Sequence, residues 1–282
     1  ASYVPGRESL DVLRAERITA DGQVFPADIQ ESDPSGREMG VYSDRRRVTV
    51  DFGALQAGDV VRLRYRLDAA GERNLFGDFF GLVEYAQEVV PKALYDVVVE
   101  APPARVLSTA VSRLQPFVRT QKDDVVTYRS RTAPLAALVV EPAMPPYPDV
   151  GAYAMVSSYA RWEDMGRWYQ GLIRDQLMLD ETLRRTAEEL VAGATSDDEK
   201  IRRIHRWVLR KTRYVGIELG IHGWKPYRVT QVVARGYGDC KDKASLLVAM
   251  LKHVGVDARL TLLRTADLGV LVDLPSMWAF NH

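Results

Sequence analysis

The sequence predicts an α+β protein in which an N-terminal antiparallel β-sandwich precedes a C-terminal α+β domain. Two observations lead to this class. Apolar residues recur at every second position in several segments of residues 1–141, and beyond a proline-rich segment they recur at the spacing of a helix. At 282 residues, the chain is also long enough for two domains of ordinary size.

Composition and charge exclude several classes of function. The chain is 46% apolar and 27% charged, as folded proteins commonly are. Its 38 basic residues balance 38 acidic ones, so no global field recruits nucleic acid, and we expect no nucleic-acid partner. No run approaches the ~18–20 apolar residues that a transmembrane helix needs. Residues 1–5 lack the features of a signal peptide, but a chain that does not open on Met is compatible with a leader that was removed.

The clearest strand pattern of the first part lies in residues 61–68. Val61, Leu63, Tyr65 and Leu67 alternate with three arginines and an aspartate, which is the period of a half-buried strand. Further strands are expected at residues 48–52, 95–100 and 125–128, with turn residues at 21–22, 58–59 and 102–103. Several short strands separated by turns predict an antiparallel sandwich over residues 1–141.

A proline-rich segment follows, with four prolines in residues 142–148. Proline fixes φ and lacks an N–H donor, so this segment cannot join a central strand or a helix interior. We therefore interpret residues 142–152 as a linker and residues 153–282 as the second domain.

Helical patterns dominate the second domain. One apolar stripe spans residues 162–173, and another spans residues 183–191, with Gly193 placed to end that helix. Residues 196–199, Ser-Asp-Asp-Glu, have the pattern of a capping box and open a third helix. This acidic cluster lacks the ligand series of a calcium loop, so the cap is the favoured interpretation.

The stretch 236–245, Gly-Tyr-Gly-Asp-Cys-Lys-Asp-Lys-Ala-Ser, holds the only cysteine of the chain, which excludes an internal disulfide and leaves the redox compartment open. A helical pattern begins at Cys240, and Asp239 is placed as its N-cap because its carboxylate can accept from the first free amides. We expect Cys240 on the apolar stripe of Ala244, Leu247, Val248, Leu251 and Val254.

Position at a helix start favours reactivity of the thiol. A helix N-terminus carries roughly half a positive charge, and a thiolate there can have a pKa well below ~8.5. Gly236 and Gly238 leave the backbone uncrowded for an approaching carbonyl, and an amide at the helix start could donate to an oxyanion. The alternative is a buried core cysteine, which has no need of a helix start flanked by glycine, aspartate and lysine.

A thiol nucleophile needs a base, and the chain has four histidines. His253 lies about 20 Å along the same helix and on a different face, which excludes it. His205 lies in a basic helix and is interpreted as a solvated or interfacial residue. His222 lies in a flexible loop, where it is poorly held. The residues alone favour His282 over His222 without deciding between them.

Two strands are expected to bring His282 to the cysteine. Residues 258–264 fit the first strand of a sheet, and residues 277–281 fit the start of a neighbouring strand after the loop 273–276. A cysteine on a helix, followed by a strand and then a histidine on the next strand, can place an imidazole within hydrogen-bond reach of the thiol.

Residues 238–244, Gly-Asp-Cys-Lys-Asp-Lys-Ala, and the apolar helix after them resemble the nucleophile helix of the transglutaminase-like family. The tail Phe280-Asn281-His282 resembles the strand that carries the family's catalytic histidine. Residues 55–65, residues 157–162 and Tyr214 are similar to bacterial proteins in which a β-rich domain of unknown function precedes a transglutaminase-like domain. The resemblance covers nearly the full length, and the cysteine block is its specific part.

The resemblance implies a catalytic triad. Cys240 is then the nucleophile of a papain-like thiol fold and His282 its base, and the third member, an aspartate, is expected beyond the chain end. Asp257, Asp267 and Asp273 all precede His282, so none takes that position. We therefore expect a transglutaminase-like domain truncated after His282, a β-sandwich lacking its first strands, and weak or no activity in residues 1–282.

Two aromatic residues are candidates for the oxyanion or substrate site. Trp224 or Tyr214 could help to bind the oxyanion, as an aromatic residue does in some relatives. Either residue could equally be a packing residue, and the sequence does not decide between these roles.

The implied function is a cysteine-dependent amide hydrolase or acyltransferase that acts through a thioester on Cys240. The partner is then a protein or peptide amide, and no cofactor or metal is required, because one cysteine with scattered histidines does not make a zinc site. The resemblance also points to an exported or periplasmic protein, and the oligomeric state is open. The alternatives are a non-catalytic binding or scaffold protein with an inactive transglutaminase-like fold, and a redox sensor that would need an outside partner.

Overall fold

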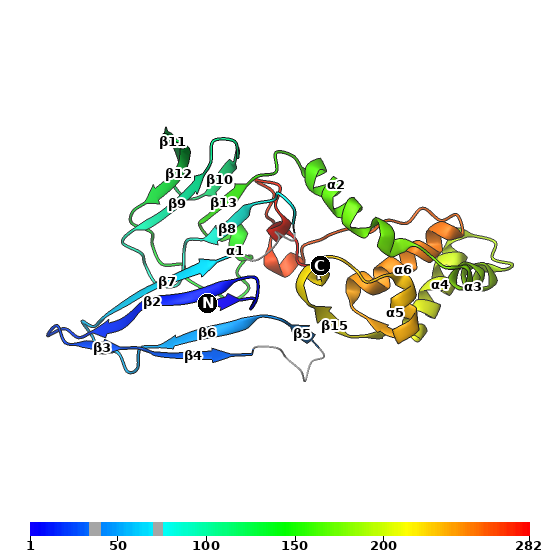
Figure 1. Ribbon diagram of the computed structural model, residues 1–282, viewed down its shortest axis with the longest axis horizontal. Helices are drawn as coiled ribbons and strands as arrows, with labels where there is room; N and C mark the ends of the chain where they lie inside the picture. The colour runs from blue at the N-terminus through cyan, green and yellow to red at the C-terminus, as the bar shows by residue number, and fades with distance from the viewer. Residues whose placement is uncertain (34–40, 70–75) are drawn as a thin grey trace. The chain divides into compact units, whose positions relative to one another are not determined.

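The computed structural model describes residues 1–33, 41–69 and 76–282 (Figure 1). By its internal contacts the chain forms two compact units, each assembled from two separate stretches. The first unit contains Ala1–Leu75 and Gln176–Val256, and the second contains Phe76–Asp175 and Asp257–His282. This division differs from the expected boundary at residues 142–152, because the first strands join the helices around Cys240 and the later strands join the C-terminal tail.

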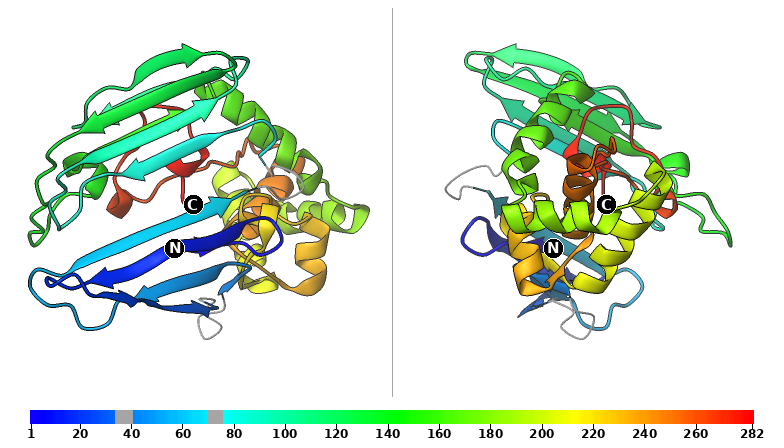
Figure 2. Two further views of the ribbon diagram at one scale, coloured as in Figure 1. Left: turned by 60° about the vertical axis from the view of Figure 1, so that its left-hand side comes forward. Right: turned by 90° about the vertical axis from the view of Figure 1, so that its right-hand side faces the viewer.

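Two antiparallel sheets of three strands lie in the N-terminal stretch of the first unit, with the orders β1-β6-β4 and β3-β2-β7. The long pair β2–β7 runs from Ser9 opposite Asp68 to Ile18 opposite Val60 (Figure 2). The strands are β1 (Ser2–Tyr3), β2 (Ser9–Ile18), β3 (Val24–Pro26), β4 (Asp28–Ser32), β6 (Arg46–Asp51) and β7 (Val60–Asp68).

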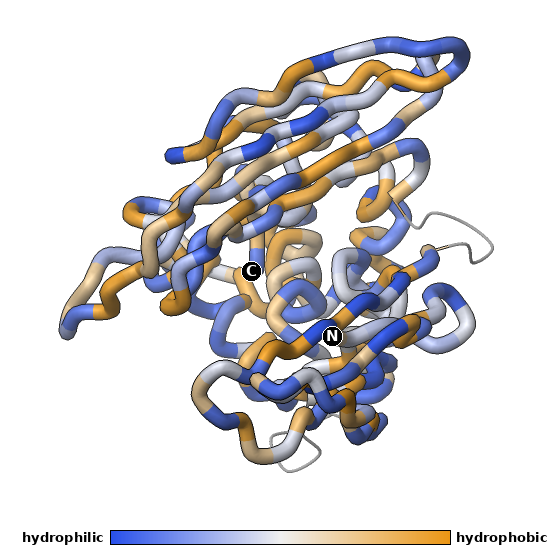
Figure 3. Tube along the Cα trace, turned by 90° about the vertical axis from the view of Figure 1, so that its left-hand side faces the viewer, coloured by the Kyte–Doolittle hydropathy of each residue, from blue (hydrophilic) through white to orange (hydrophobic). Residues whose placement is uncertain are grey.

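The alternation along β7 is real, but its apolar face is more exposed than the sequence predicted. Apolar and polar positions alternate along the strands (Figure 3), yet Leu63, Tyr65 and Leu67 keep 46, 52 and 47% of their surface accessible. A cavity of about 490 Å³ is lined by Leu63 and by the β6 residues Val48 and Val50. The two sheets therefore do not close into a tightly packed core at this point.

Four α-helices of the described residues complete the first unit, and capping residues explain where two of them begin. Asp180 caps α3 (Glu181–Val191) by accepting from the backbone amide three residues on, and Gly193 follows the end of α3 with a φ of 71°. Ser196 caps α4 (Asp197–Lys211) by accepting from the amide of Glu199. The Glu199 carboxylate accepts from the amide of Thr195, and not from Ser196 as a capping box requires.

Helix α6 (Cys240–His253) is the centre of this helical part, because it contacts α3, α4 and α5 (Val229–Arg235). The contacts bury apolar side chains from all four helices. These core residues are Leu183, Ala187, Ile204, Val208, Val229, Val232, Leu246 and Met250.

Two short parallel pairs position the segments around the start of α6. Strand β14 (Arg213–Tyr214) pairs with β16 (Tyr237–Gly238), the strand that leads into α6. Strand β15 (Gly216–Glu218) pairs with β5 (Val41–Ser43), and the amide of Gly220 donates to the Asp44 carboxylate at 3.0 Å. The N-terminal strands thus hold the segment that carries the 3-10 helix η3 (Gly220–Gly223).

The second unit contains two antiparallel sheets, β10-β13-β8 and β11-β12-β9, that pack on each other (Figure 2). Residues of both sheets share one apolar cluster, formed by Val99, Ala101, Leu107, Val126, Tyr128 and Val156. The strands are β8 (Gly81–Tyr85), β9 (Tyr95–Ala101), β10 (Ser108–Ser112), β11 (Val118–Lys122), β12 (Val125–Thr132) and β13 (Tyr153–Ser157).

The proline-rich segment packs against the second unit instead of running free as a linker. It contains the short helix α1 (Tyr147–Val150), with proline at its N-terminal end, where a missing N–H costs nothing. The Tyr147 hydroxyl accepts from the amide of Gln87 at 2.8 Å and donates to its carbonyl at 2.6 Å. Helix α2 (Trp162–Ile173) and the 3-10 helix η2 (Arg174–Leu177) come after β13.

The tail after α6 lies on the sheet β10-β13-β8. Leu271 and Ala279 pack with Tyr153 and Met155, and the Tyr153 hydroxyl donates to the Asp273 carboxylate at 2.6 Å. Burial and this carboxylate raise the pKa of Tyr153 to about 12. The tail is therefore an integral part of the second unit.

The two strands expected at residues 258–264 and 277–281 are not formed. Ala266–Leu268 and Met277–Ala279 are the 3-10 helices η4 and η5, and pairing is limited to the backbone bonds of Leu263 with Asn281 and His282. The Ser276 side chain caps η5, and the Trp278 ring N–H donates to the carbonyl of Gly81, a residue distant in the sequence, at 3.1 Å, so packing partners and not strand pairing set the course of this segment. Within the described ranges, no helix combines the length and apolar character needed to cross a membrane.

Candidate active site

Cys240 is the first residue of α6, and Asp239 is the N-cap. The Asp239 carboxylate accepts from the amide of Asp242 at 3.2 Å, and the Asp242 carboxylate accepts from the amide of Asp239 at 3.3 Å. This reciprocal capping box satisfies two backbone donors that a helix start otherwise leaves free. The backbone of Cys240 is thus fixed between two mutually capping residues.

The burial of α6 differs from the predicted stripe. The most deeply buried positions at its N-terminal half are Asp242, Ser245 and Leu246, each with no accessible surface. Cys240, Ala244 and Leu247, which recur at helical spacing, are only half-buried. Cys240 therefore lies on the less buried side of the first turns of α6, and not among its most deeply buried residues.

Asp242 joins three segments of the first unit through its carboxylate. In addition to the amide of Asp239, it accepts from the amide of Tyr227 at 2.7 Å and from the Arg235 guanidinium at 2.9 Å. The pKa of Asp242 is raised above its ordinary value, first by burial and next by the Asp239 carboxylate. The Tyr227 amide and the cations of Lys241 and Arg235 oppose this rise in part. All three partners are donors, so the arrangement fits the ionised carboxylate.

Two lysines complete the charge pattern at the helix start. Lys241 forms an ion pair with the buried carboxylate of Asp239, and Lys243 donates to the carbonyl of Thr212 at 2.8 Å. Two carboxylates are thus matched by the cations of Lys241 and Arg235. The field at Cys240 consequently depends on the positions of these groups and not on a net excess of one sign.

Gly238 has a packing role that the sequence analysis did not foresee. A β-carbon at this position would lie 2.6 Å from the β-carbon of Asp242 and 2.8 Å from its carboxylate. Gly236 ends α5 with a φ of 73°, a conformation that favours glycine. Both glycines therefore allow the chain to turn from α5 into the start of α6 next to Asp242.

The structure places the two aromatic candidates in the same unit as Cys240. Tyr214 lies in β14 and is exposed. Its pairing partner is Gly238, which precedes Cys240 by two positions. Trp224 follows η3 and is half-buried. Tyr214 is thus tied by backbone pairing to the strand that leads to Cys240, and Trp224 belongs to the loop that β15 and Asp44 hold.

His222 is firmly held, which corrects the expectation of a flexible loop. Its Nδ1 lies 2.9 Å from the carbonyl of Lys225, and its ring stacks on Tyr227 with centroids 3.8 Å apart and planes 7° apart. Arg235 lies over the Tyr227 ring as well, at 4.1 Å from the centroid. Since a carbonyl only accepts, the neutral ring carries its proton on Nδ1 and its lone pair on Nε2.

The other histidines lie in different surroundings. His253, at the far end of α6, contacts the Glu188 carboxylate at 2.8 Å, and His205 is exposed on α4. His282 belongs to the second unit, where its amide and carbonyl both pair with Leu263, whereas Cys240 belongs to the first unit.

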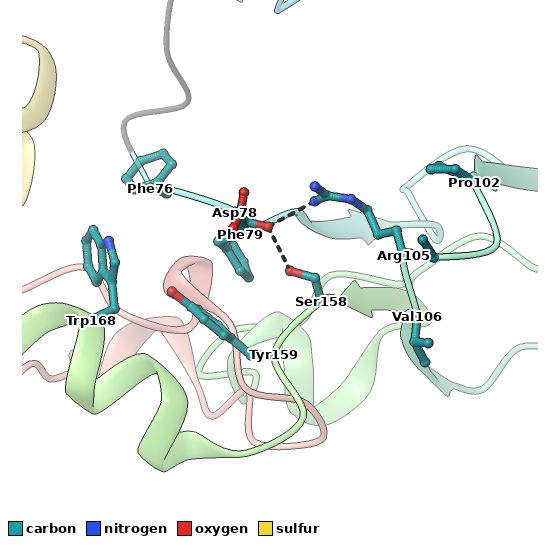
Figure 4. Close-up of a pocket in the computed structure, with 11 residues that line it drawn as sticks. Phe76, Asp78, Phe79, Pro102, Arg105, Val106, Ser158, Tyr159 and Trp168 are labelled. Carbon is teal, nitrogen blue, oxygen red and sulfur yellow. Dashed lines mark hydrogen bonds between the residues drawn. The ribbon is translucent and has the colours of Figure 1, made fainter.

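A pocket of about 660 Å³ lies within the second unit (Figure 4). Tyr159 stacks on Phe79 with ring centroids 4.7 Å apart, and Trp168 forms a further aromatic wall. Arg105 reaches the carbonyl of Asp78 at 2.9 Å (Figure 4). The pocket offers rings and a guanidinium to a ligand, but no cysteine or histidine lines it, so it does not supply thiol chemistry.

Metal ligands do not gather in the described part of the chain. Over residues 1–33, 41–69 and 76–282, no group of three or more His, Cys, Asp or Glu side chains is placed to hold a metal ion. The two carboxylates that flank Cys240 in the sequence are instead paired with the cations of Lys241 and Arg235.

Comparison with known proteins finds two family models that match parts of this chain. Residues 1–138 match the model of a domain of unknown function with a solved structure, DUF3857, and residues 184–278 match that of the transglutaminase-like superfamily. A match to DUF3857 is thus followed along the chain by a match to the transglutaminase-like superfamily, which supports a papain-like thiol hydrolase or transferase fold for the second match. This confirms the resemblance inferred from the sequence and the α+β class. A comparison with curated proteins gave no match.

A solved structure shares the fold. The crystal structure of a "putative protease" from Parabacteroides distasonis is similar with a TM-score of 0.71 and 17% sequence identity. The similarity covers 90% of this chain and 50% of that protein's chain, so this chain spans half the length of that relative. At this identity the likeness shows the fold alone.

Asp242, Arg235 and Tyr227 were not predicted from the sequence as parts of this site. The aspartate carried a signal, since an acidic residue three positions after an N-cap is typical of a capping box. Arg235 and Tyr227 carried none, because their role depends on how α5 packs beside the start of α6.

Proposed function

We propose that the protein is a cysteine-dependent amide hydrolase or acyltransferase with Cys240 as nucleophile and a protein or peptide amide as substrate. The observation that carries this proposal is the position of Cys240, half-buried at the capped first turn of α6 within a transglutaminase-like domain. A helix start favours the thiolate over the thiol, and the thiolate is the reactive form.

The reaction follows from this assignment. A base takes the proton of the Cys240 thiol, and the sulfur attacks the amide carbonyl carbon, forming a C–S bond and a tetrahedral oxyanion. The oxyanion collapses, the C–N bond breaks, and the base returns the proton to the leaving amine. The thioester then transfers its acyl group to an amine or to water. A backbone amide of the first turn of α6, with Tyr214 or Trp224, is proposed to stabilise the oxyanion.

His282 is the proposed base, in accordance with the family resemblance. His222 is the second candidate, because its lone pair is fixed on Nε2 by the Lys225 carbonyl and it shares a compact unit with Cys240. The two assignments differ in which substitution raises the thiol pKa, so the choice between them is open to direct measurement.

Acylation of Cys240 tests the function. The protein is incubated with a peptide p-nitrophenyl ester, and the adduct is located by peptide mass spectrometry. One acyl group on Cys240 supports the proposal. Faster loss of this acyl group when a primary amine is added identifies an amine as the acceptor, and loss at the same rate without the amine identifies water. Cys240→Ala serves as the control for acylation of lysines. Acylation by an activated ester needs a single attack by the thiol and no turnover, so the test holds for residues 1–282, in which weak turnover is expected. No acyl group on Cys240 in the folded protein overturns the catalytic proposal and favours the non-catalytic binding or scaffold role.

A further inference from the structure

The side chains of Arg235 and Asp242 meet beneath the first turn of α6. The Asp242 side chain is 1% exposed and that of Arg235 is 20% exposed, and the Nη2 and Oδ2 atoms lie 2.9 Å apart. The guanidinium is fixed by more than this contact, because its Nε donates to the carbonyl of Tyr237 at 2.9 Å. One planar group therefore links the end of α5, strand β16 and α6.

Aromatic rings hold the same guanidinium on its faces. Its carbon lies 4.1 Å from the ring centroid of Tyr227 and 4.9 Å from that of Tyr237. Tyr227 in turn stacks with His222, and its amide donates to Asp242. The loop that carries His222 and the helix that carries Cys240 are thus connected through one arginine and one aspartate.

Because the pair is largely buried, we do not expect its main role to be an increase in the free energy of unfolding. Removing two charges from water is costly, and a buried ion pair often contributes little net stability compared with apolar residues. The pair instead defines geometry. The Arg235 guanidinium donates in a fixed plane and the Asp242 carboxylate accepts from three donors, so these bonds form together in one arrangement of α5, β16 and α6.

We propose that Arg235 and Asp242 form a positioning pair that fixes the first turn of α6, and with it the thiol of Cys240, relative to the loop of residues 222–228. This inference rests on the proposed function, since it concerns the orientation of the nucleophile. Neither residue is proposed to touch substrate; both act through the backbone of the helix start.

The single cysteine makes the test direct, because alkylation by iodoacetamide reports on Cys240 alone. The pH–rate profile is measured for Arg235→Lys, which keeps the charge but loses the fork, and for Asp242→Asn, which keeps the shape but loses the charge. Positioning predicts that both variants raise the pH midpoint of alkylation, and that at a pH below both midpoints the rate falls by about tenfold for each unit by which the thiol pKa rises.

Pure electrostatics predicts a different pattern. Arg235→Lys would leave the profile unchanged, and Asp242→Asn would lower the thiol pKa, because a negative charge near the thiolate is removed. The matched controls are Arg259→Lys and Asp257→Asn, an exposed pair 3.1 Å apart that should have no effect. Folding is checked by the Tm of each variant.

The outcomes decide the proposal. Slower alkylation with a raised thiol pKa in folded variants supports it, and if Asp242→Asn does not fold, Arg235→Lys carries the test. A wild-type profile in folded Arg235→Lys, or the electrostatic pattern, overturns it, as does failure of both variants to fold. Alkylation needs no acyl donor, so absence of an acyl adduct in the wild type would reject the proposed function separately.

Discussion

Asp239 and Asp242 cap each other at the start of α6, each carboxylate accepting from the backbone amide of the other. Cys240 lies between them in the sequence, and these two hydrogen bonds fix the position of its backbone. Asp239 is also paired with Lys241 and is nearly inaccessible to solvent. We therefore expect Asp239→Ala to lower the free energy of unfolding by about 1–2 kcal/mol, the usual range for loss of an N-cap.

Chemical denaturation measures this change. The control is Asp257→Ala, which removes an exposed carboxylate that is not a cap and should change stability by less than about 0.5 kcal/mol. Equal effects of the two substitutions would contradict the assignment of Asp239 as the residue that holds the start of α6.

Gly238 should not tolerate a side chain. A β-carbon there would lie 2.6 Å from the β-carbon of Asp242, and this neighbour is fixed by three hydrogen bonds. Gly238→Ala is expected to lower the free energy of unfolding by about 1–3 kcal/mol through overpacking, measured by denaturant titration.

Gly171→Ala in α2 is the matched control. No atom lies within 4 Å of a β-carbon placed at Gly171, so alanine should stabilise the helix by about 0.5–1 kcal/mol. A neutral result for Gly238→Ala would show that Asp242 moves freely, and would weaken the positioning role of that residue.

Ser245 carries a buried hydroxyl without a hydrogen-bond partner among the described residues. An unpaired buried hydroxyl costs about 1–3 kcal/mol, and alanine is the better helix former. We expect Ser245→Ala to raise the free energy of unfolding by about 1 kcal/mol. A loss of stability of similar size would show that the hydroxyl is satisfied in solution, for instance by a bound water.

The ionised Glu199 carboxylate should make part of the free energy of unfolding depend on pH. Its amide hydrogen bond from Thr195, and next the contact with Arg203, lower its pKa below the ordinary 4.5. A folded-state pKa below the unfolded value means that the stabilising contribution is present above pH 4.5 and is lost as the pH falls through the folded value.

The measurement is the difference in Tm between the wild type and Glu199→Gln at pH 7 and at pH 3. The wild type should have the higher Tm at pH 7, and the difference should become smaller at pH 3. Other carboxylates titrate in both proteins, so their effect cancels in this difference. A difference that is constant over this range would contradict the role of the Glu199 charge.

The choice of base is predicted from the family resemblance. His282→Ala should shift the pH midpoint of Cys240 alkylation upward, because the thiolate loses a partner cation, whereas His222→Ala should leave a smaller shift. The reverse order would transfer the role to His222, whose ring is already held by Lys225 and Tyr227.

Local chemistry explains which features could be predicted from the sequence. Strands such as β7 and β12, and the helices after Ser196 and Asp239, follow from residue period and capping, which act over a few neighbours. The exposure of Leu63 could not be predicted, because it depends on how closely two sheets approach.

The site shows the same limit. An aspartate before a helical pattern caps that helix whatever surrounds it, so the start of α6 is a local property. The contacts of Asp242 with Arg235 and Tyr227 are not local, and the tail at residues 277–281 turns into η5 because Ser276 and Trp278 find partners there. Such partners are set by packing, which a single sequence does not display.

The pH–rate profile of Cys240 alkylation by iodoacetamide in the wild-type protein shows whether Cys240 is an activated nucleophile. An activated nucleophile at the capped start of α6 should show a midpoint well below the ~8.5 of a free thiol. A midpoint at or above ~8.5 would contradict the account, because Cys240 would then be an ordinary cysteine at a helix start.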